Sequence, residues 1–314
     1  MTHRFFRFLA CIVLFSPVLG AREAAPSPTR TPCDSTSEKA TPDGPASGTR
    51  PTTKNVDAKA VNFQDDDFAS RMELATFKLF NRDSTATCFL VTPPRELGLD
   101  EKQVIIVTAR HVFERMGGEQ AILVLRTVHG DGSFTRRDFP VKIRNGVEPL
   151  WTHHPKMDVA VLPVALPDDI LARPIDFDSL ADEAALKSAG VHVGGEVLVL
   201  TYPMRNEANL AGFALARHAS IASYPLMPIR LVDGFKLDFN TFAGDSGGPA
   251  FMSDPRHKEA GGNTPLVLGI VISQLREDEK TVLMNEERTV HVSMDLGNVV
   301  YAQFARETIQ RLKK

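Results

Sequence analysis

The residues with the clearest chemical potential lie in the run Ala243-Gly244-Asp245-Ser246-Gly247-Gly248-Pro249. Glycines on both sides let a serine sit on a tight turn where the backbone closely approaches a substrate. The N–H groups of Gly244 and Ser246 can then point at one spot. Such a pair stabilises the oxyanion of an acyl-transfer intermediate, and losing one donor typically costs about 10²–10³ in rate. A plain glycine-rich turn is the alternative.

A nucleophilic serine needs a base, and the base needs an orienting carboxylate. His111 follows the apolar run that ends at Thr108 and begins a short helical stretch, so it can be held rigidly at the edge of a cleft. Asp158 stands at the head of the apolar run 158–162, where a buried acid is costly unless it is paired or hydrogen-bonded. A metal site made of Asp158, His153 and His154 is the alternative there, although adjacent histidines point to opposite sides of an extended chain.

The elements that would position these residues are short strands in two groups. We predict the first group at 73–80, 85–91, 103–108, 121–128, 137–143 and 158–164, and the second at 191–200, 214–222, 229–239, 248–252, 266–273 and 281–293. Short helices are expected at 111–116 and 180–188, and an amphipathic one at 298–312. This pattern predicts an all-β fold of two six-stranded antiparallel barrels with a C-terminal α-helix. His111 and Asp158 fall in the first group and Ser246 in the second, so a cleft between the barrels would unite them.

The three runs around His111, Asp158 and Ser246 resemble the signatures of trypsin-like serine peptidases. The resemblance covers about 73–312, and the runs 193–198 and 214–223 look more like the bacterial, disulfide-free branch that includes the protease domain of Deg/HtrA proteins. It implies a serine endopeptidase in which Ser246 is the nucleophile and His111 the general base and then acid. Asp158 would orient the histidine, and the backbone N–H groups of Gly244 and Ser246 would form the oxyanion hole.

The resemblance also implies where a substrate side chain would bind. Asn240, six residues before the nucleophile, would lie at the base of the primary pocket, and Ile272, Ser273 and Gln274 would form its wall. Because Asn240 is uncharged, we predict a small or medium uncharged residue before the scissile bond. No Ile-Val-Gly-Gly-like start precedes the first strand, so Asp245 must be held by something other than a new N-terminus.

Two other functions compete with the peptidase. The run around Ser246 also fits the G-x-S-x-G pattern of an α/β-hydrolase esterase, but that fold needs a helix after the serine and the order Ser, Asp, His. Here Pro249 and a strand follow. A catalytically silent binding protein on a protease fold is the other alternative, since a blocked pocket would not show in the sequence.

Residues 1–67 show no pattern of the predicted strands and helices. Residues 1–21 have the basic, apolar and small-residue pattern of a signal peptide, so we predict an exported protein, periplasmic or secreted. An uncleaved membrane anchor is the alternative, although the apolar run is shorter than the ~20 residues of a spanning helix. Residues 22–67 are rich in Pro, Thr and Ser and read as a disordered tail, with a propeptide as the alternative. The peptidase domain is expected at 68–314.

Composition limits the partners. The 314 residues carry a formal net charge of −3, which gives no reason to expect a nucleic-acid or membrane-surface partner. We expect a protein or peptide substrate, no cofactor and no metal, and no stable membrane insertion after signal cleavage; the oligomeric state is open. Three cysteines, of which Cys11 leaves with the signal, predict no disulfide. Cys88, in an apolar run, is a packing residue, with a nucleophilic role as the weaker alternative.

Overall fold

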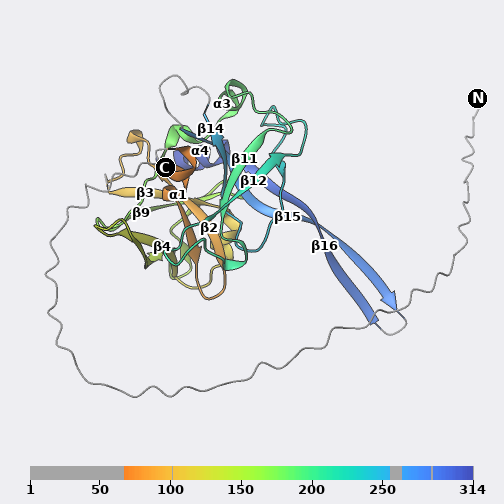
Figure 1. Ribbon diagram of the computed structural model, residues 1–314, viewed down its shortest axis with the longest axis horizontal. Helices are drawn as coiled ribbons and strands as arrows, with labels where there is room; N and C mark the ends of the chain where they lie inside the picture. Colours follow the sequence, from red (N-terminus) through yellow and green to blue (C-terminus); the bar gives the residue numbers. More distant parts are fainter. Residues whose placement is uncertain (1–66, 101, 255–263, 284–285, 314) are drawn as a thin grey trace, which may run out of the picture. The chain divides into compact units, whose positions relative to one another are not determined.

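The computed structural model describes residues 67–100, 102–254, 264–283 and 286–313 (Figure 1). The predicted signal peptide at 1–21 and all of the predicted tail except Asp67 lie outside the described residues. The chain divides into the units 1–53 and 54–314, and every described residue belongs to the second. No helix in the described ranges has the length and apolar character needed to cross a membrane.

The first half of the described chain forms an eight-stranded sheet. Seven strands follow the order β5-β4-β1-β2-β3-β9-β8, and β10 pairs in parallel with β2. The side chains on its inner face, including Phe77, Leu90, Ile106 and Leu123, are fully buried. The strands are β1 (Thr76–Phe80), β2 (Thr85–Thr92), β3 (Gln103–Thr108), β4 (Gln120–Val128), β5 (Phe134–Lys142), β8 (Thr152–His153), β9 (Ala160–Ala165) and β10 (Ile175–Asp176).

The second half closes into a six-stranded antiparallel barrel in the order β11-β12-β13-β16-β15-β14. Val199, Leu237, Phe251 and Leu268 fill it and are fully buried. The strands are β11 (Glu196–Thr201), β12 (Leu215–Ile221), β13 (Gly234–Asp238), β14 (Pro249–Ser253), β15 (Pro265–Leu283) and β16 (Glu286–Tyr301). The closed barrel, the second sheet and a terminal helix make a chymotrypsin-like double-barrel fold, which confirms the predicted fold class.

Helices and minor elements complete the fold. The last helix, α4, buries Phe304, Ala305 and Ile309 against the core, as its amphipathic pattern predicts. The two-stranded ladder of β6 and β7 is separate from both sheets. The bounds are α1 (Phe68–Ala75), α2 (Arg110–Arg115), α3 (Glu183–Ser188), α4 (Ala302–Gln310), β6 (Arg144–Asn145) and β7 (Glu148–Pro149).

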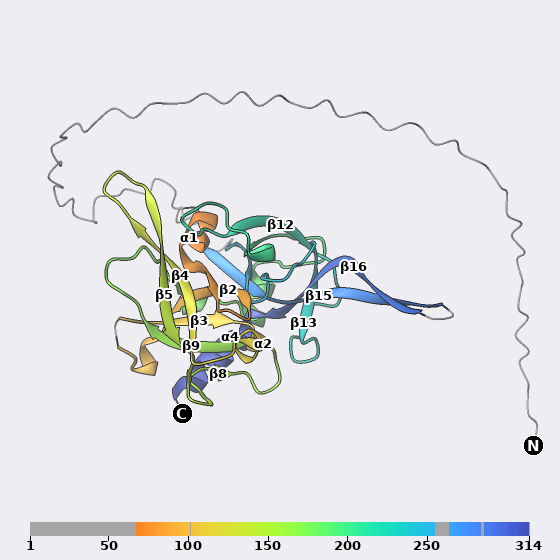
Figure 2. The same ribbon diagram turned by 90° about the horizontal axis from the view of Figure 1, so that it is seen from below.

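Several elements differ from the sequence-based prediction. Strand β13 is shorter than the predicted 229–239, and residues 298–301, expected as the start of the last helix, belong to β16. The predicted strand 281–293 spans the end of β15 and the first part of β16. Residues 73–75, expected as strand, end helix α1, because the Asp67 carboxylate accepts the N–H groups of Ala69 and Ser70 and so caps the helix start. Strands β15 and β16 are longer than predicted and pair with each other from Gly269↔Tyr301 to Leu283↔Glu286. Their outer halves continue beyond the barrel as a two-stranded arm (Figures 1 and 2).

Candidate active site

His111 and Asp158 are brought together by the pairing of β3 with β9. The register places Thr108 opposite Ala160, so the ends of both strands lie side by side. Asp158 Oδ2 is 2.6 Å from His111 Nδ1, and Asp158 Oδ1 accepts the backbone N–H of His111 at 2.9 Å. One carboxylate therefore holds both the ring and the backbone of the histidine.

The environment keeps the Asp158 carboxylate ionised. Burial raises the pKa of Asp158, but the hydrogen bonds from His111 and its charge outweigh that effect, and the pKa lies below its ordinary value. An ionised partner on Nδ1 favours the tautomer with the free lone pair on Nε2, which is the tautomer that a general base requires.

Ser246 sits on a turn that only glycines permit. Gly247 has a φ of +91°, and a Cβ on it would lie 1.9 Å from the Thr87 carbonyl oxygen. Ser246 Oγ donates to the carbonyl oxygen of Ile272 at 3.2 Å, and no hydrogen bond joins it to His111 in the described part of the chain. In ligand-free sites the nucleophile–base bond is often long and tightens on substrate binding.

Ser246 and His111 nevertheless lie at the same cavity, which has a volume of about 540 Å³. Asp158 lines the cavity too, so the three residues predicted as a triad are brought together.

The N–H groups predicted as an oxyanion hole are free of acceptors within 67–100, 102–254, 264–283 and 286–313. The carbonyl oxygen of Ala243 accepts the N–H of Met204 at 2.7 Å. Because the C=O and N–H of a trans peptide point in opposite directions, this bond turns the N–H of Gly244 away from Met204. Gly244 has a φ of +103°, and a Cβ there would lie 2.2 Å from the Tyr202 carbonyl, so the position requires glycine.

Thr87 ties the Ser246 turn to the first sheet. Its N–H donates to the Ser246 carbonyl at 2.9 Å, and its hydroxyl donates to the Gly244 carbonyl at 2.8 Å. The same hydroxyl accepts the N–H of Tyr202 at 3.2 Å, and Thr108 Oγ1 donates to the Thr87 carbonyl at 2.8 Å. Sequence reasoning missed Thr87, whose only signal was a polar residue within the apolar run of β2.

Asp245 is held by Arg217, a residue that the sequence analysis did not single out. Arg217 Nη2 lies 2.6 Å from Asp245 Oδ2, and the same oxygen accepts the N–H of Phe242 at 2.8 Å. Only 1% of the Asp245 side chain is exposed, and this burial raises its pKa against the opposing charge of Arg217. The Arg217 guanidinium is therefore the group that holds Asp245 in place of a new N-terminus.

The predicted substrate-binding residues divide into two groups. Ile272, Ser273 and Gln274 line the 540 Å³ cavity. Asn240 is not among the residues that line it; its side chain is exposed and its carbonyl oxygen accepts Arg217 Nη1 at 2.7 Å. Gln274 is fixed across the hairpin, where its amide donates to Ser293 Oγ at 2.6 Å.

The residues considered for other chemistry lie in unsuitable places. Among the described residues no group of three His, Cys, Asp or Glu side chains could hold a metal. His154 bonds to Glu307 at 3.2 Å, and His153 bonds to the His154 carbonyl. Cys88 is fully buried, which raises the pKa of its thiol, so it is not available as a nucleophile.

Comparisons with known proteins give fold similarity alone. No protein-family model matches the chain, and no curated protein matches it. The crystal structure of a serine-to-alanine mutant of Rv3671c from M. tuberculosis H37Rv, in an inactive form, is 20% identical over 78% of this chain and 89% of that one, with a TM-score of 0.42. The protease Anisep from Arthrobacter nicotinovorans is 12% identical over 77% of this chain and 97% of that one, with a TM-score of 0.44. Likenesses this distant assign neither family nor activity, so the fold rests on the strand order and the site on its own geometry.

Proposed function

We propose that this protein is a serine endopeptidase that works through an acyl-enzyme. The observation that carries the proposal is the pair of hydrogen bonds that the Asp158 carboxylate accepts from His111, at the cavity that Ser246 also lines. A histidine oriented in this way beside a serine on a glycine turn has the parts of an activated nucleophile. The free N–H groups of Gly244 and Ser246 supply donors for the oxyanion.

In the proposed reaction, His111 Nε2 takes the Ser246 hydroxyl proton as Oγ attacks the peptide carbonyl. The Oγ–carbon bond forms, and the carbonyl π electrons move to the oxygen, which the two N–H groups stabilise. The C–N bond then breaks, and the imidazolium gives its proton to the leaving amine. Water repeats the sequence on the acyl-enzyme and regenerates Ser246.

We further propose that the enzyme is exported and belongs with the disulfide-free bacterial peptidases of the Deg/HtrA type. The apolar N-terminal run at 1–21 supports export, and the runs 193–198 and 214–223 support the resemblance.

A catalytically silent binding protein is the second candidate. The observation in its favour is that Ser246 Oγ bonds to the Ile272 carbonyl at 3.2 Å instead of to His111. If that arrangement persisted when a peptide bound, the hydroxyl would not be activated.

Labelling with a fluorophosphonate separates these two functions. The probe needs an activated serine and an oxyanion hole but no knowledge of the substrate. We expect labelling of the wild type and none of Ser246→Ala or His111→Ala. The fully buried Cys88 provides a matched control, since Cys88→Ser should leave the Ser246 label in place. An unlabelled but folded wild type would favour the binding protein.

A further inference from the structure

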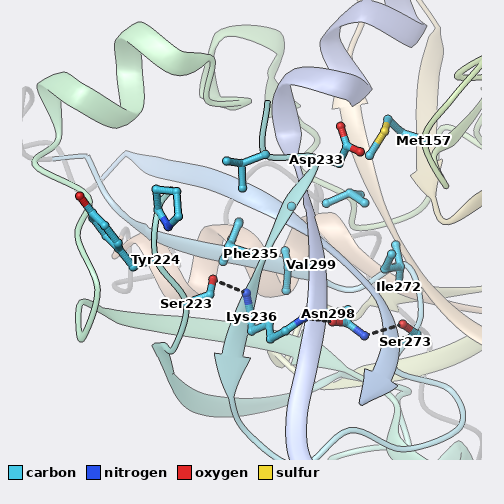
Figure 3. A pocket seen from close by; sticks show the side chains of 14 residues that line it. Met157, Ser223, Tyr224, Asp233, Phe235, Lys236, Ile272, Ser273, Asn298 and Val299 are labelled. Carbon is cyan, nitrogen blue, oxygen red and sulfur yellow. Dashed lines mark hydrogen bonds between the residues drawn. The ribbon is translucent and has the colours of Figure 1, made fainter. Parts of the chain in front are cut away.

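Two further cavities each share lining residues with the cavity at Ser246, and we refer to the three together as the cleft. The 540 Å³ cavity shares His111, Arg115 and Ser246 with a neighbour of about 610 Å³ on the side of Gly244. It shares Ile272 and Ser273 with a third cavity of about 390 Å³ (Figure 3). An extended peptide with its scissile bond at Ser246 would therefore meet cavities on both sides.

Positive side chains recur along this cleft. Arg115 lines both cavities that contain Ser246, and Arg205 lines the one on the Gly244 side. Lys236 lines the third cavity, and Arg276 lines the central one. No ion pair of the described residues involves Arg115, Arg205 or Lys236, and Arg276 has only a 3.8 Å contact with the exposed Asp278.

Lys236 is directed toward the substrate-facing strand. Its ammonium donates to Asn298 Oδ1 at 3.0 Å, and the Asn298 amide donates to Ser273 Oγ at 3.0 Å. Figure 3 shows Lys236, Asn298 and Ser273 joined in this order by hydrogen bonds. The ammonium is thus fixed by neutral partners and keeps its charge available to a ligand.

Four carboxylates line the same cavities, but two of them pair with arginines outside these cavities, so the cations remain in excess. Asp245 pairs with Arg217, whereas Asp158 is held by His111 and keeps its negative charge. Asp83, at the outer edge, contacts Arg82 at 3.5 Å. Asp233 lies at the opposite end of the third cavity from Ser273, on the side of Met157 (Figure 3).

We infer that the cleft selects acidic peptide segments, with Asp or Glu side chains on both sides of the scissile bond. The inference rests on the proposed peptidase function and deepens it by naming the substrate class. Residues on both sides of the scissile bond would then meet Arg115, Arg205 and Lys236. The whole chain has a formal net charge of −3, so an acidic substrate would be attracted by the cleft and not by the protein as a whole.

The test compares two ten-residue peptide libraries that are identical except that Asp and Glu in one are replaced by Asn and Gln in the other. We expect the wild type to cleave the acidic library with about tenfold higher kcat/KM at low salt, because several exposed charge contacts each add a small factor. The ratio should fall toward one as salt shortens the range of these contacts.

Variants show which cations are responsible. Arg115→Gln/Arg205→Gln and Lys236→Gln should each lower the acidic-to-neutral ratio and flatten its salt dependence. Arg311→Gln, at the end of α4 and outside the three cavities, is the matched control and should leave the ratio unchanged. A wild-type ratio near one, or a preference for the neutral library, overturns the inference.

Binding to Ser246→Ala keeps this test separate from the test of catalysis. Fluorescence anisotropy with dye-labelled members of both libraries should show about tenfold tighter binding of acidic peptides. If the wild type takes the fluorophosphonate but Ser246→Ala binds both libraries equally, the peptidase proposal stands and the acidic preference is wrong. If the wild type is not labelled but acidic peptides bind more tightly, catalysis is wrong and the acidic preference stands.

Discussion

Replacing Arg217 by Met should damage the active site without touching any residue of the triad. Arg217 comes from β12, and its guanidinium is the charged partner of the Asp245 carboxylate, at 2.6 Å. Asp245 lies between Gly244 and Ser246 in the chain, so the position of its carboxylate sets the peptides that are proposed to form the oxyanion hole. Met keeps much of the apolar contact that Arg217 makes with the Phe239 ring, 4.7 Å from its guanidinium carbon.

The size of the effect follows from burial. Removing one member of a buried ion pair typically costs 3–5 kcal/mol, because the other charge is left without a partner. Arg217 is 22% exposed, so water reduces the loss, while Asp245 is 1% exposed and its Oδ1 has no hydrogen-bond partner. We expect unfolding free energy to fall by about 3 kcal/mol at neutral pH. Burial already raises the pKa of Asp245, and without Arg217 it should rise further.

The pH dependence identifies the cause. When a carboxyl group has a higher pKa in the folded than in the unfolded protein, the protein loses stability as the pH rises through the interval between the two pKa values. The difference between wild type and Arg217→Met should therefore be smallest at acid pH and largest above that interval. Urea unfolding at several pH values measures the stability, and fluorophosphonate labelling measures the site.

Arg217→Lys tests the geometry of the pair, because an ammonium keeps the charge but not the planar guanidinium. Its unfolding free energy and labelling rate should lie between those of the wild type and Arg217→Met. If Arg217→Met had the same unfolding free energy and the same labelling rate as the wild type, the ion pair would not hold the Ser246 turn, and the prediction would be refuted.

Three further perturbations test the rest of the site and its support. Asp158→Asn should reduce turnover about 10⁴-fold while leaving the fold intact, since the amide favours the wrong histidine tautomer; near-normal turnover would remove Asp158 from the triad. Burial raises the pKa of Glu73 to about 7 against the charge of Arg126, so wild-type stability should decline as pH rises from about 4.5 to above 7. In urea unfolding, Glu73→Gln should remove up to about 3 kcal/mol of that decline. Thr87→Val should lower the unfolding free energy by about 1–3 kcal/mol and slow labelling, because the buried Gly244 carbonyl and Tyr202 N–H lose their partner. Thr87→Ser should restore stability and labelling, and a failure to restore them would assign the loss to packing.

The sequence predicted the parts of the fold that depend on local pattern. Strand β3 has the predicted bounds, because an unbroken apolar run at 104–107 lies between the polar residues Gln103 and Thr108. The arm formed by 274–283 and 286–295 was predicted only in part, as a single strand at 281–293 that spans the end of β15 and the first part of β16. The sequence of the arm is rich in charged residues and shows no clear apolar alternation, so only the pairing of β15 with β16 gives the bounds of its two strands.

The candidate site likewise contains residues that local sequence patterns predict and residues that they do not. The glycine turn at Ser246, His111 after a buried strand and Asp158 before one carry local signals, and the structure brings them to one cavity. Thr87 contacts Gly244 across 157 positions of sequence, and Arg217 contacts Asp245 across 28. Neither residue has a local pattern that distinguishes it from a strand threonine or a surface arginine.

These long-range contacts explain why the triad residues alone do not define the site. Asp158 positions His111 within the first sheet, and Arg217 positions Asp245 within the second barrel. Thr87 then joins the two halves, because its backbone and hydroxyl bind the peptides on both sides of Asp245. A change in the packing of either half would therefore be transmitted to the distance between Ser246 and His111. That distance decides whether the serine bonds to the imidazole or stays with the Ile272 carbonyl, and so whether the Ser246 hydroxyl can be activated as the proposed function requires.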